Sequence, residues 1–248
     1  MRSLLIGSLL VIVFAAGSPG VGAVEPDWQG YRQLLSEYVE PGVKDAIPLN
    51  LVNYQGLGSD PRFAALVSMV RNFDVGRLER REEKLAFYIN AYNLLTIQLI
   101  LDEWPVDSIR DIGNFLRGPW DRVMLQNADG NLTLDDIEHR VLRPLGEPRI
   151  HVAVNCASIS CPDLRDEPYE AAKLDWQLDD QARKFLSQSG KGLSVEGDLA
   201  RVSAIFGWYG EDFGGRPGVE VFLRKYAEPI DFKRIKTDLK YNWRLNNN

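Results

Sequence analysis

The most continuous hydrophobic stretch after the N-terminus lies at residues 85–101, where nearly every position is apolar. A helix that is apolar all round is normally buried in the middle of a domain, so we predict a buried central helix here that stops near Pro105. Glu83, Asn90 and Asn93 follow one another at spacings of seven and three, which places them along one line of the helix surface. Buried carboxylates and amides need hydrogen-bond partners, so this line is expected either to tie down neighbouring loops or to face a functional site.

Weaker patterns along the rest of the chain predict a mixture of helices and strands. Helical periodicity and N-cap signals favour helices at residues 27–39, 62–73, 134–144, 169–188 and 217–226. Alternation and turn residues favour an extended segment at 49–57, a strand at 149–155, and hairpins that turn at Asp129-Gly130 and Gly197-Asp198. In the strand at 149–155, His151, Ala153 and Asn155 would share one face. We therefore predict an α+β fold with mainly antiparallel strands and without internal repeats.

The first 23 residues have the layout of a secretory signal peptide. Arg2 precedes an apolar run at residues 4–16, a Gly/Ser/Pro break and a small-residue site that ends at Ala23. The run is too short to span a bilayer, so we expect cleavage after Ala23 and export to the periplasm or the medium. No later stretch reaches the roughly 20 apolar residues of a transmembrane helix, and we expect no transmembrane segment. Residues 24–248 are then predicted to form a single domain.

Charge narrows the classes of partner. The whole chain carries 29 basic and 35 acidic residues, and removal of Arg2 with the signal leaves 28 basic residues and a formal charge of −7. An acidic chain without a Lys/Arg cluster is a poor match for a phosphate backbone, so we expect no nucleic-acid partner. The expected partner is a peptide or protein of unknown identity.

All the histidines and cysteines of the chain fall in one short stretch. His139, His151, Cys156 and Cys161 lie within residues 137–161. Two cysteines in an exported chain are compatible with a disulfide, although a bridge across so small a loop would stabilise little. The spacing does not fit a structural zinc site, so we expect no metal and no cofactor.

The same cluster is compatible with a thiol nucleophile at Cys156, which needs a base and a group that orients that base. In an extended strand His151 would lie about 16 Å from Cys156, beyond hydrogen-bond reach. We therefore predict His139 as the base, with His151 as the alternative. Asp135 and Asp136 precede His139 by four and three positions, on the side of the helix that could orient its ring. Backbone N–H groups in the "CASIS" segment are the expected oxyanion donors.

Several motifs carry a family resemblance. They are "EEKLAFYINAYNLLT", "GPWD", "LTLDDIEHRVLR", "PRIHVAVNCASISCPDL", "LDWQLDDQARKFL", "FGWYGEDFG" and "YNWRLN". In this order they resemble the bacterial form of domain-of-unknown-function family 547, from about Val52 to Asn246. The sequence departs from that pattern at Asn242, where "YDWxLN" would have Asp.

The resemblance identifies residues that match family motifs, but it does not name an activity. Glu83, Asn90, Asn93, His139, His151 and Cys156 match family motifs. It also implies similarity to papain-like and transglutaminase-like folds, in which a buried central helix packs on an antiparallel sheet, the nucleophilic Cys starts that helix and the His lies on a strand. The central helix here begins without a cysteine.

Two functional hypotheses follow. In the first, the thiol comes from the strand end, Glu83 orients a histidine, and the exported protein is a cysteine-hydrolase-like enzyme that acts on peptide or isopeptide bonds. In the second, the protein is a non-catalytic exported binding domain whose Cys156 and Cys161 form a structural disulfide.

Overall fold

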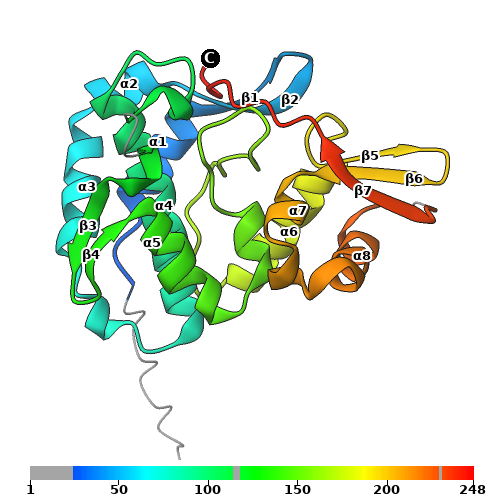
Figure 1. Ribbon diagram of the computed structural model, residues 1–248. Helices are drawn as coiled ribbons and strands as arrows, with labels where there is room; N and C mark the ends of the chain where they lie inside the picture. The colour runs from blue at the N-terminus through cyan, green and yellow to red at the C-terminus, as the bar shows by residue number, and fades with distance from the viewer. Residues whose placement is uncertain (1–24, 114–117, 229–230) are drawn as a thin grey trace, which may run out of the picture.

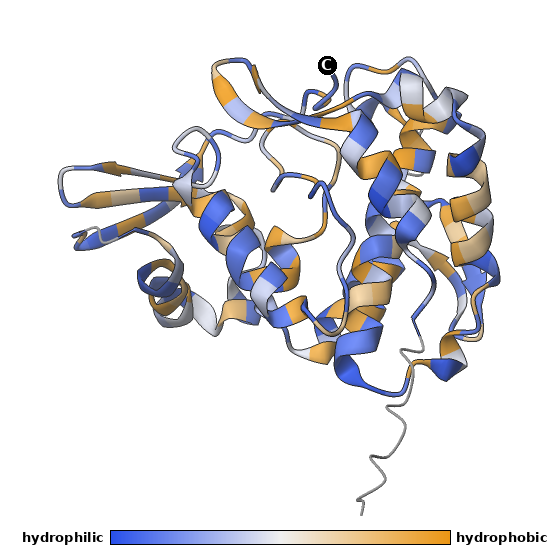
Figure 2. Ribbon diagram, turned by 180° about the vertical axis from the view of Figure 1, so that it is seen from behind, coloured by the Kyte–Doolittle hydropathy of each residue, from blue (hydrophilic) through white to orange (hydrophobic). Residues whose placement is uncertain are grey.

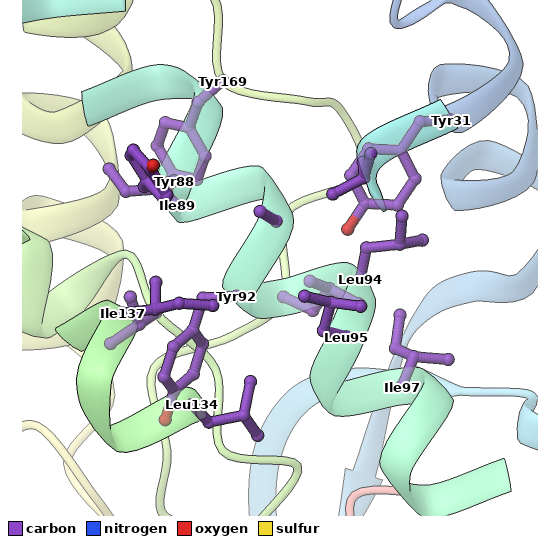
Figure 3. Close-up of a cluster of buried hydrophobic side chains, with 14 of the residues drawn as sticks. Tyr31, Tyr88, Ile89, Tyr92, Leu94, Leu95, Ile97, Leu134, Ile137 and Tyr169 are labelled. Atoms are coloured by element: carbon purple, nitrogen blue, oxygen red, sulfur yellow. The ribbon is translucent and has the colours of Figure 1, made fainter. Parts of the chain in front are cut away.

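The computed structural model describes residues 25–113, 118–228 and 231–248, and the expected signal peptide lies outside these residues. Helix α4 (Arg81–Asp102) runs through the larger of two hydrophobic clusters, and Leu85, Phe87 and Leu95 on it are fully buried. Figure 3 shows Tyr92 and Leu94 of this helix together with side chains of neighbouring segments, among them Tyr31 and Leu134. The helix has the length and composition of a membrane span, but 83% of its most apolar window is buried inside the structure. The predicted buried central helix is therefore confirmed.

Short helices and two hairpins surround α4 (Figure 1). They are α1 (Gln29–Tyr38), β1 (Val39–Lys44), β2 (Ile47–Val52), α2 (Tyr54–Ser59), α3 (Pro61–Asn72), β3 (Val123–Asn127), β4 (Gly130–Thr133) and α5 (Leu134–Asp136). The local sequence explains these boundaries. Asp60 accepts a hydrogen bond from the N–H of Arg62 at the start of α3, and Thr133 and Asp136 form a reciprocal capping box at the start of α5. Gly130 has φ +108° in the β3–β4 turn, a conformation that glycine adopts without strain.

The second hydrophobic cluster lies among the later elements of the chain. These elements are α6 (Leu174–Ser187), β5 (Leu193–Glu196), β6 (Leu199–Ser203), α7 (Ile205–Trp208), α8 (Gly215–Tyr226) and β7 (Arg234–Leu239). Strands β5 and β6 pair antiparallel, and β7 adds to β6 in parallel. Figure 2 shows orange apolar segments on these helices as well as on those around α4. The hairpin predicted at Gly197-Asp198 and the helix predicted at 217–226 are confirmed.

The α+β class is confirmed, and the strands are arranged in small sheets. Two sheets have two strands each and one has three, and the described residues form no larger sheet. Helix α4 has its main contacts with α2, α3 and the helical segment after α5. The likeness to papain-like and transglutaminase-like folds stays a prediction.

The strand predicted at residues 149–155 is wrong. Residues Pro148–Val152 form a 3₁₀ helix, because the Glu147 side chain caps the N–H of Arg149 and proline supplies a suitable φ at the first helical position. No strand among the described residues pairs with this segment. Ile150 and Val152 are buried as part of a helical turn, and Val154 is buried in the loop that follows it. The chain between His151 and Cys156 is therefore not extended, and the separation of about 16 Å expected from strand geometry does not apply.

Candidate functional site

The asparagines of α4 hold two loops by their backbone. Asn93 donates from Nδ2 to the carbonyl oxygen of Ala153 at 3.1 Å and accepts at Oδ1 the N–H of Asn155 at 2.8 Å. Asn90 bonds the backbone of Tyr169 in the same way: its Nδ2 donates to the carbonyl oxygen and its Oδ1 accepts the N–H, both at 2.8 Å. All these groups are buried, so each amide satisfies two backbone groups that water does not reach. The structural alternative, that the polar line ties down neighbouring loops, is confirmed for these two residues.

Glu83 has a different task from the predicted one. Its carboxylate accepts the backbone N–H groups of Glu79 and Arg80 at 3.1 and 3.0 Å, and also pairs with the Arg80 side chain. These bonds lower the pKa of Glu83, the N–H of Arg80 first among the causes that lower it, against the opposing effect of burial. Glu83 thus caps α4, and the expectation that it orients a histidine is wrong.

The segment that carries Cys156 is fixed from several sides. Asn155 donates from Nδ2 to the carbonyl oxygen of Pro162 at 2.7 Å and accepts the N–H of Ala157 at 2.9 Å. The C-terminal segment, residues 241–248, runs back along this loop (Figure 1), where Ile159 donates to the carbonyl oxygen of Arg244 at 2.8 Å. Hydrogen bonds from neighbouring segments therefore hold the turn that carries the thiol in place.

Cys156 and Cys161 are free cysteines, the first half-buried and the second buried. The sulfur of Cys156 lies 3.2 Å from Ser158 Oγ and 3.3 Å from the hydroxyl of Tyr241. A hydrogen bond from the Cys161 thiol, and then those from Ser158 and Tyr241, lower the pKa of Cys156 to about 7 against the effect of burial. Burial raises the pKa of Cys161, so Cys156 is the thiolate of the pair.

Most of the backbone N–H groups expected as oxyanion donors already have other acceptors. The N–H of Cys156 donates to the sulfur of Cys161 at 2.9 Å, and that of Ala157 donates to Asn155. The N–H groups of Ile159 and Ser160 donate to carbonyl oxygens of the C-terminal segment. The N–H of Ser158 is the member of the segment that bonds the Cys156 sulfur. The prediction of backbone oxyanion donors therefore stays a prediction for Ser158, and the hydroxyls nearest the sulfur belong to Ser158 and Tyr241.

His151 is enclosed between two carboxylates. Its Nε2 lies 2.7 Å from Asp212 Oδ2, and its Nδ1 lies 3.5 Å from Glu138 Oε1. The ring stacks on Tyr209, with centroids 3.9 Å apart and planes at 16°. Burial alone would raise the pKa of Glu138, but the hydrogen bond and charge of His151 bring it below its usual value.

His139 makes different contacts from those of His151. Its Nδ1 lies 2.6 Å from Nη1 of Arg143, and its Nε2 lies 3.4 Å from Asp135 Oδ1. Asp135 thus meets the ring as predicted. Asp136 does not, because its carboxylate caps α5 and pairs with Arg140.

A cavity of about 350 Å³ brings these groups together. It is lined by Tyr92, Trp120, Asp121, Asp135, Glu138, His139, His151, Val154, Cys156, Cys161, Pro162, Ile205, Trp208, Tyr209, Tyr241 and Trp243. Both histidines and both cysteines of the sequence cluster therefore face one space. Among the described residues, however, neither imidazole is hydrogen-bonded to Cys156, whose sulfur contacts hydroxyls instead.

Sequence reasoning missed three residues that shape this site: Tyr209, Asp212 and Tyr241. They lie 48 to 80 positions after Cys161, the last residue of the cysteine and histidine cluster. The motifs "FGWYGEDFG" and "YNWRLN" contain these residues. The motifs identified the two segments, but nothing in the sequence indicated that the segments fold against the histidines and cysteines.

Asp212 predicts a measurable pH dependence of stability. Its hydrogen bond to Arg143, and next the one to His151, lower its pKa to about 2. A carboxyl group whose pKa is lowered by folding stabilises the fold above its unfolded pKa, and this contribution is lost as the pH falls through the folded value. We expect Asp212→Asn to reduce the free energy of unfolding by about 2 kcal/mol at pH 6, and the gap to wild type to narrow between about pH 5 and pH 2. Urea unfolding over that range measures the gap; a gap that stays constant would contradict the assignment.

One comparison with known proteins gives a result. A family model described as "Protein of unknown function, DUF547" matches residues 76–186. The match includes α4, His139, His151 and both cysteines, whereas Asp212 and Tyr241 lie beyond it. No curated protein and no solved structure matches the chain.

Proposed function

Since the chain belongs to the DUF547 family through residues 76–186, we propose that it is a thiol-dependent acyl hydrolase or acyltransferase with Cys156 as the nucleophile. One observation carries the proposal: a half-buried sulfur faces a cavity while two hydroxyls and a second thiol stabilise its ionised form. A thiolate is the nucleophilic form of cysteine, so such a sulfur reacts at neutral pH without first losing a proton to a base. Export through a signal peptide at residues 1–23 is part of the proposal.

The reaction that fits this site is transfer of an acyl group from a peptide or isopeptide bond. The thiolate attacks the carbonyl carbon, an S–C bond forms, and the C–N bond breaks as the amine leaves with a proton from an acid in the cavity. Water or another amine then attacks the thioester and returns a proton to that group, the S–C bond breaks, and Cys156 is released as a thiolate. The hydroxyls of Ser158 and Tyr241, which stabilise the resting sulfur, are the candidate donors to the oxyanion.

His151 fits the acid–base role better than His139. Arginine has no acceptor, so Nδ1 of His139 must accept from Arg143, and that ring presents only an N–H at Nε2. Asp212 accepts from Nε2 of His151, which leaves Nδ1 of this ring as the atom that gains and loses a proton. Asp212 is then the residue that positions His151, in place of the predicted Glu83.

A second candidate function is a non-catalytic exported binding domain. The observation that favours it is that both imidazoles pair with other side chains and neither is bonded to the thiol. In that case the cavity holds a ligand without reacting with it. Oxidation of Cys156 and Cys161 to a disulfide would then be compatible with function.

Thiol alkylation separates the two. At pH 7 we expect iodoacetamide to modify Cys156 severalfold faster than a free model thiol of pKa about 8.5, because about half of Cys156 is ionised and only a few per cent of the model thiol. Cys161 is expected to react far more slowly, since it is buried and its pKa is raised. Peptide mass spectrometry of the full chain, with Cys156→Ser as the control, assigns each rate.

Two results of this experiment would contradict a nucleophilic Cys156. A Cys156 rate no greater than that of the model thiol, or a Cys156–Cys161 disulfide in protein kept without reductant, would end the nucleophile proposal. The binding domain would then be the better account.

A further inference from the structure

The cavity around Cys156 has a one-sided distribution of charge. Asp121, Asp135 and Glu138 line it, and among the residues that the structure describes no lysine or arginine does. The thiolate of Cys156 adds further negative charge. A partly enclosed space with charges of one sign attracts the opposite sign and disfavours its own. An anionic ligand is therefore a poor match.

The walls of the cavity add aromatic faces. Trp208 lies 4.9 Å from Tyr241 and 5.8 Å from Trp243 between ring centroids, and Trp120 lies 5.9 Å from Trp243. Two rings of the lining already attract cations of the protein itself. The guanidinium of Arg110 lies 5.3 Å from the centroid of Trp243, and that of Arg143 lies 5.6 Å from the centroid of Tyr209. Aromatic faces attract cations in this way, and Trp120 and Trp208 of the lining have no such cation partner among the described residues.

From these two observations we infer that the cavity recognises a cationic substrate, namely a peptide-like molecule with a primary ammonium group of the lysine type. The ammonium lies among the aromatic rings and the carboxylates, and the aliphatic chain packs on Trp208 and Tyr241. The inference names the substrate class for the site of the proposed function and rests on that proposal for treating the occupant as a substrate. Recognition itself needs no reaction at Cys156.

Binding to the Cys156→Ser full chain tests the inference without any chemistry. The probes are Nα-acetyl-lysine methylamide, the norleucine analogue that keeps the chain but lacks the ammonium, and the glutamate analogue. Three tryptophans line the cavity, so intrinsic fluorescence reports occupancy. We expect the lysine probe to bind at least about tenfold more tightly than the norleucine probe, and the glutamate probe to bind most weakly. Raising the salt concentration should weaken the lysine probe alone.

Charge removal in the lining supplies the matched variants. Asp135→Asn, and more strongly Asp135→Asn with Asp121→Asn, should reduce the preference for lysine severalfold, while Asp166→Asn, at an exposed carboxylate outside the lining, should leave it unchanged. Equal binding of lysine and norleucine probes, absence of saturable lysine binding, or a preference that survives the double change would each overturn the inference. If lysine binding is not selective but Cys156 is alkylated rapidly, only the proposed substrate class is wrong. Selective lysine binding with an inert Cys156 removes the proposed reaction only.

Discussion

Replacing Asn93 with leucine is expected to lower the free energy of unfolding by about 2–5 kcal/mol. The change keeps the branched shape and the number of side-chain heavy atoms, but leaves the carbonyl oxygen of Ala153 and the N–H of Asn155 without their partner in a buried site. Each buried polar backbone group that loses its hydrogen bond costs about 1–3 kcal/mol. Urea denaturation followed by circular dichroism measures the loss, and an unchanged m-value would show that both proteins unfold in the same way.

Two further asparagines make this experiment specific. Asn72→Leu on the exposed end of α3 should change stability by no more than about 0.5 kcal/mol, because that amide bonds only within its own helix. Asn90→Leu should cost about as much as Asn93→Leu, but should leave the reactivity of Cys156 unchanged, since Asn90 grips Tyr169 and not the turn before the cysteine. A loss below about 1 kcal/mol for Asn93→Leu would mean that the turn at 153–155 is held by other contacts.

The parts of the fold that the sequence predicted are those that local chemistry decides. The apolar run of α4 has no stable alternative to burial, and Asp60 followed by Pro61 supplies an N-cap and a first helical residue for α3. Gly130 and Gly197 mark their hairpin turns through positive φ. In each case a few neighbouring residues suffice, and tertiary contacts only reinforce their preference.

The strand prediction failed where local and tertiary preferences differ. Ile150, Val152 and Val154 alternate as in a strand, but strand formation needs a partner strand, and the sequence does not say whether one is near. Here Pro148 and the capping Glu147 decide for a 3₁₀ turn. The error mattered for function, because the extended geometry had separated His151 from Cys156.

The site was predicted in its composition but not in its pairings. The clustering of histidine and cysteine correctly indicated residues that face one cavity. Which side chain meets which depends on segments far along the chain: Asp212 reaches His151 across 61 positions, and Tyr241 reaches Cys156 across 85. A single sequence has no local signal for such distances, so the base was assigned to His139 and the orienting acid to Glu83.

The hydroxyls at the sulfur lead to the second large effect. We expect Tyr241→Phe and Ser158→Ala together to raise the pKa of Cys156 from about 7 toward the value of an ordinary thiol, because two donors to the thiolate are removed while burial remains. At pH 6.5 the ionised fraction, and with it the alkylation rate, should fall by roughly tenfold or more. The pH profile of alkylation gives the midpoint directly.

The midpoint of the pH profile of alkylation is a better measure of the pKa of Cys156 than the alkylation rate at high pH. A thiolate of higher pKa is intrinsically more nucleophilic, so the plateau rate of the double variant should equal or exceed that of wild type even as its rate near neutrality falls. A general loosening of the turn would raise reactivity at every pH and leave the midpoint in place. Tyr38→Phe, which removes a hydroxyl that bonds Asp60 on another part of the fold, should leave both midpoint and plateau unchanged. A midpoint that does not move in the double variant would show that the hydroxyls of Ser158 and Tyr241 do not stabilise the thiolate, and the low pKa of Cys156 would then depend on Cys161 and the backbone N–H of residue 158.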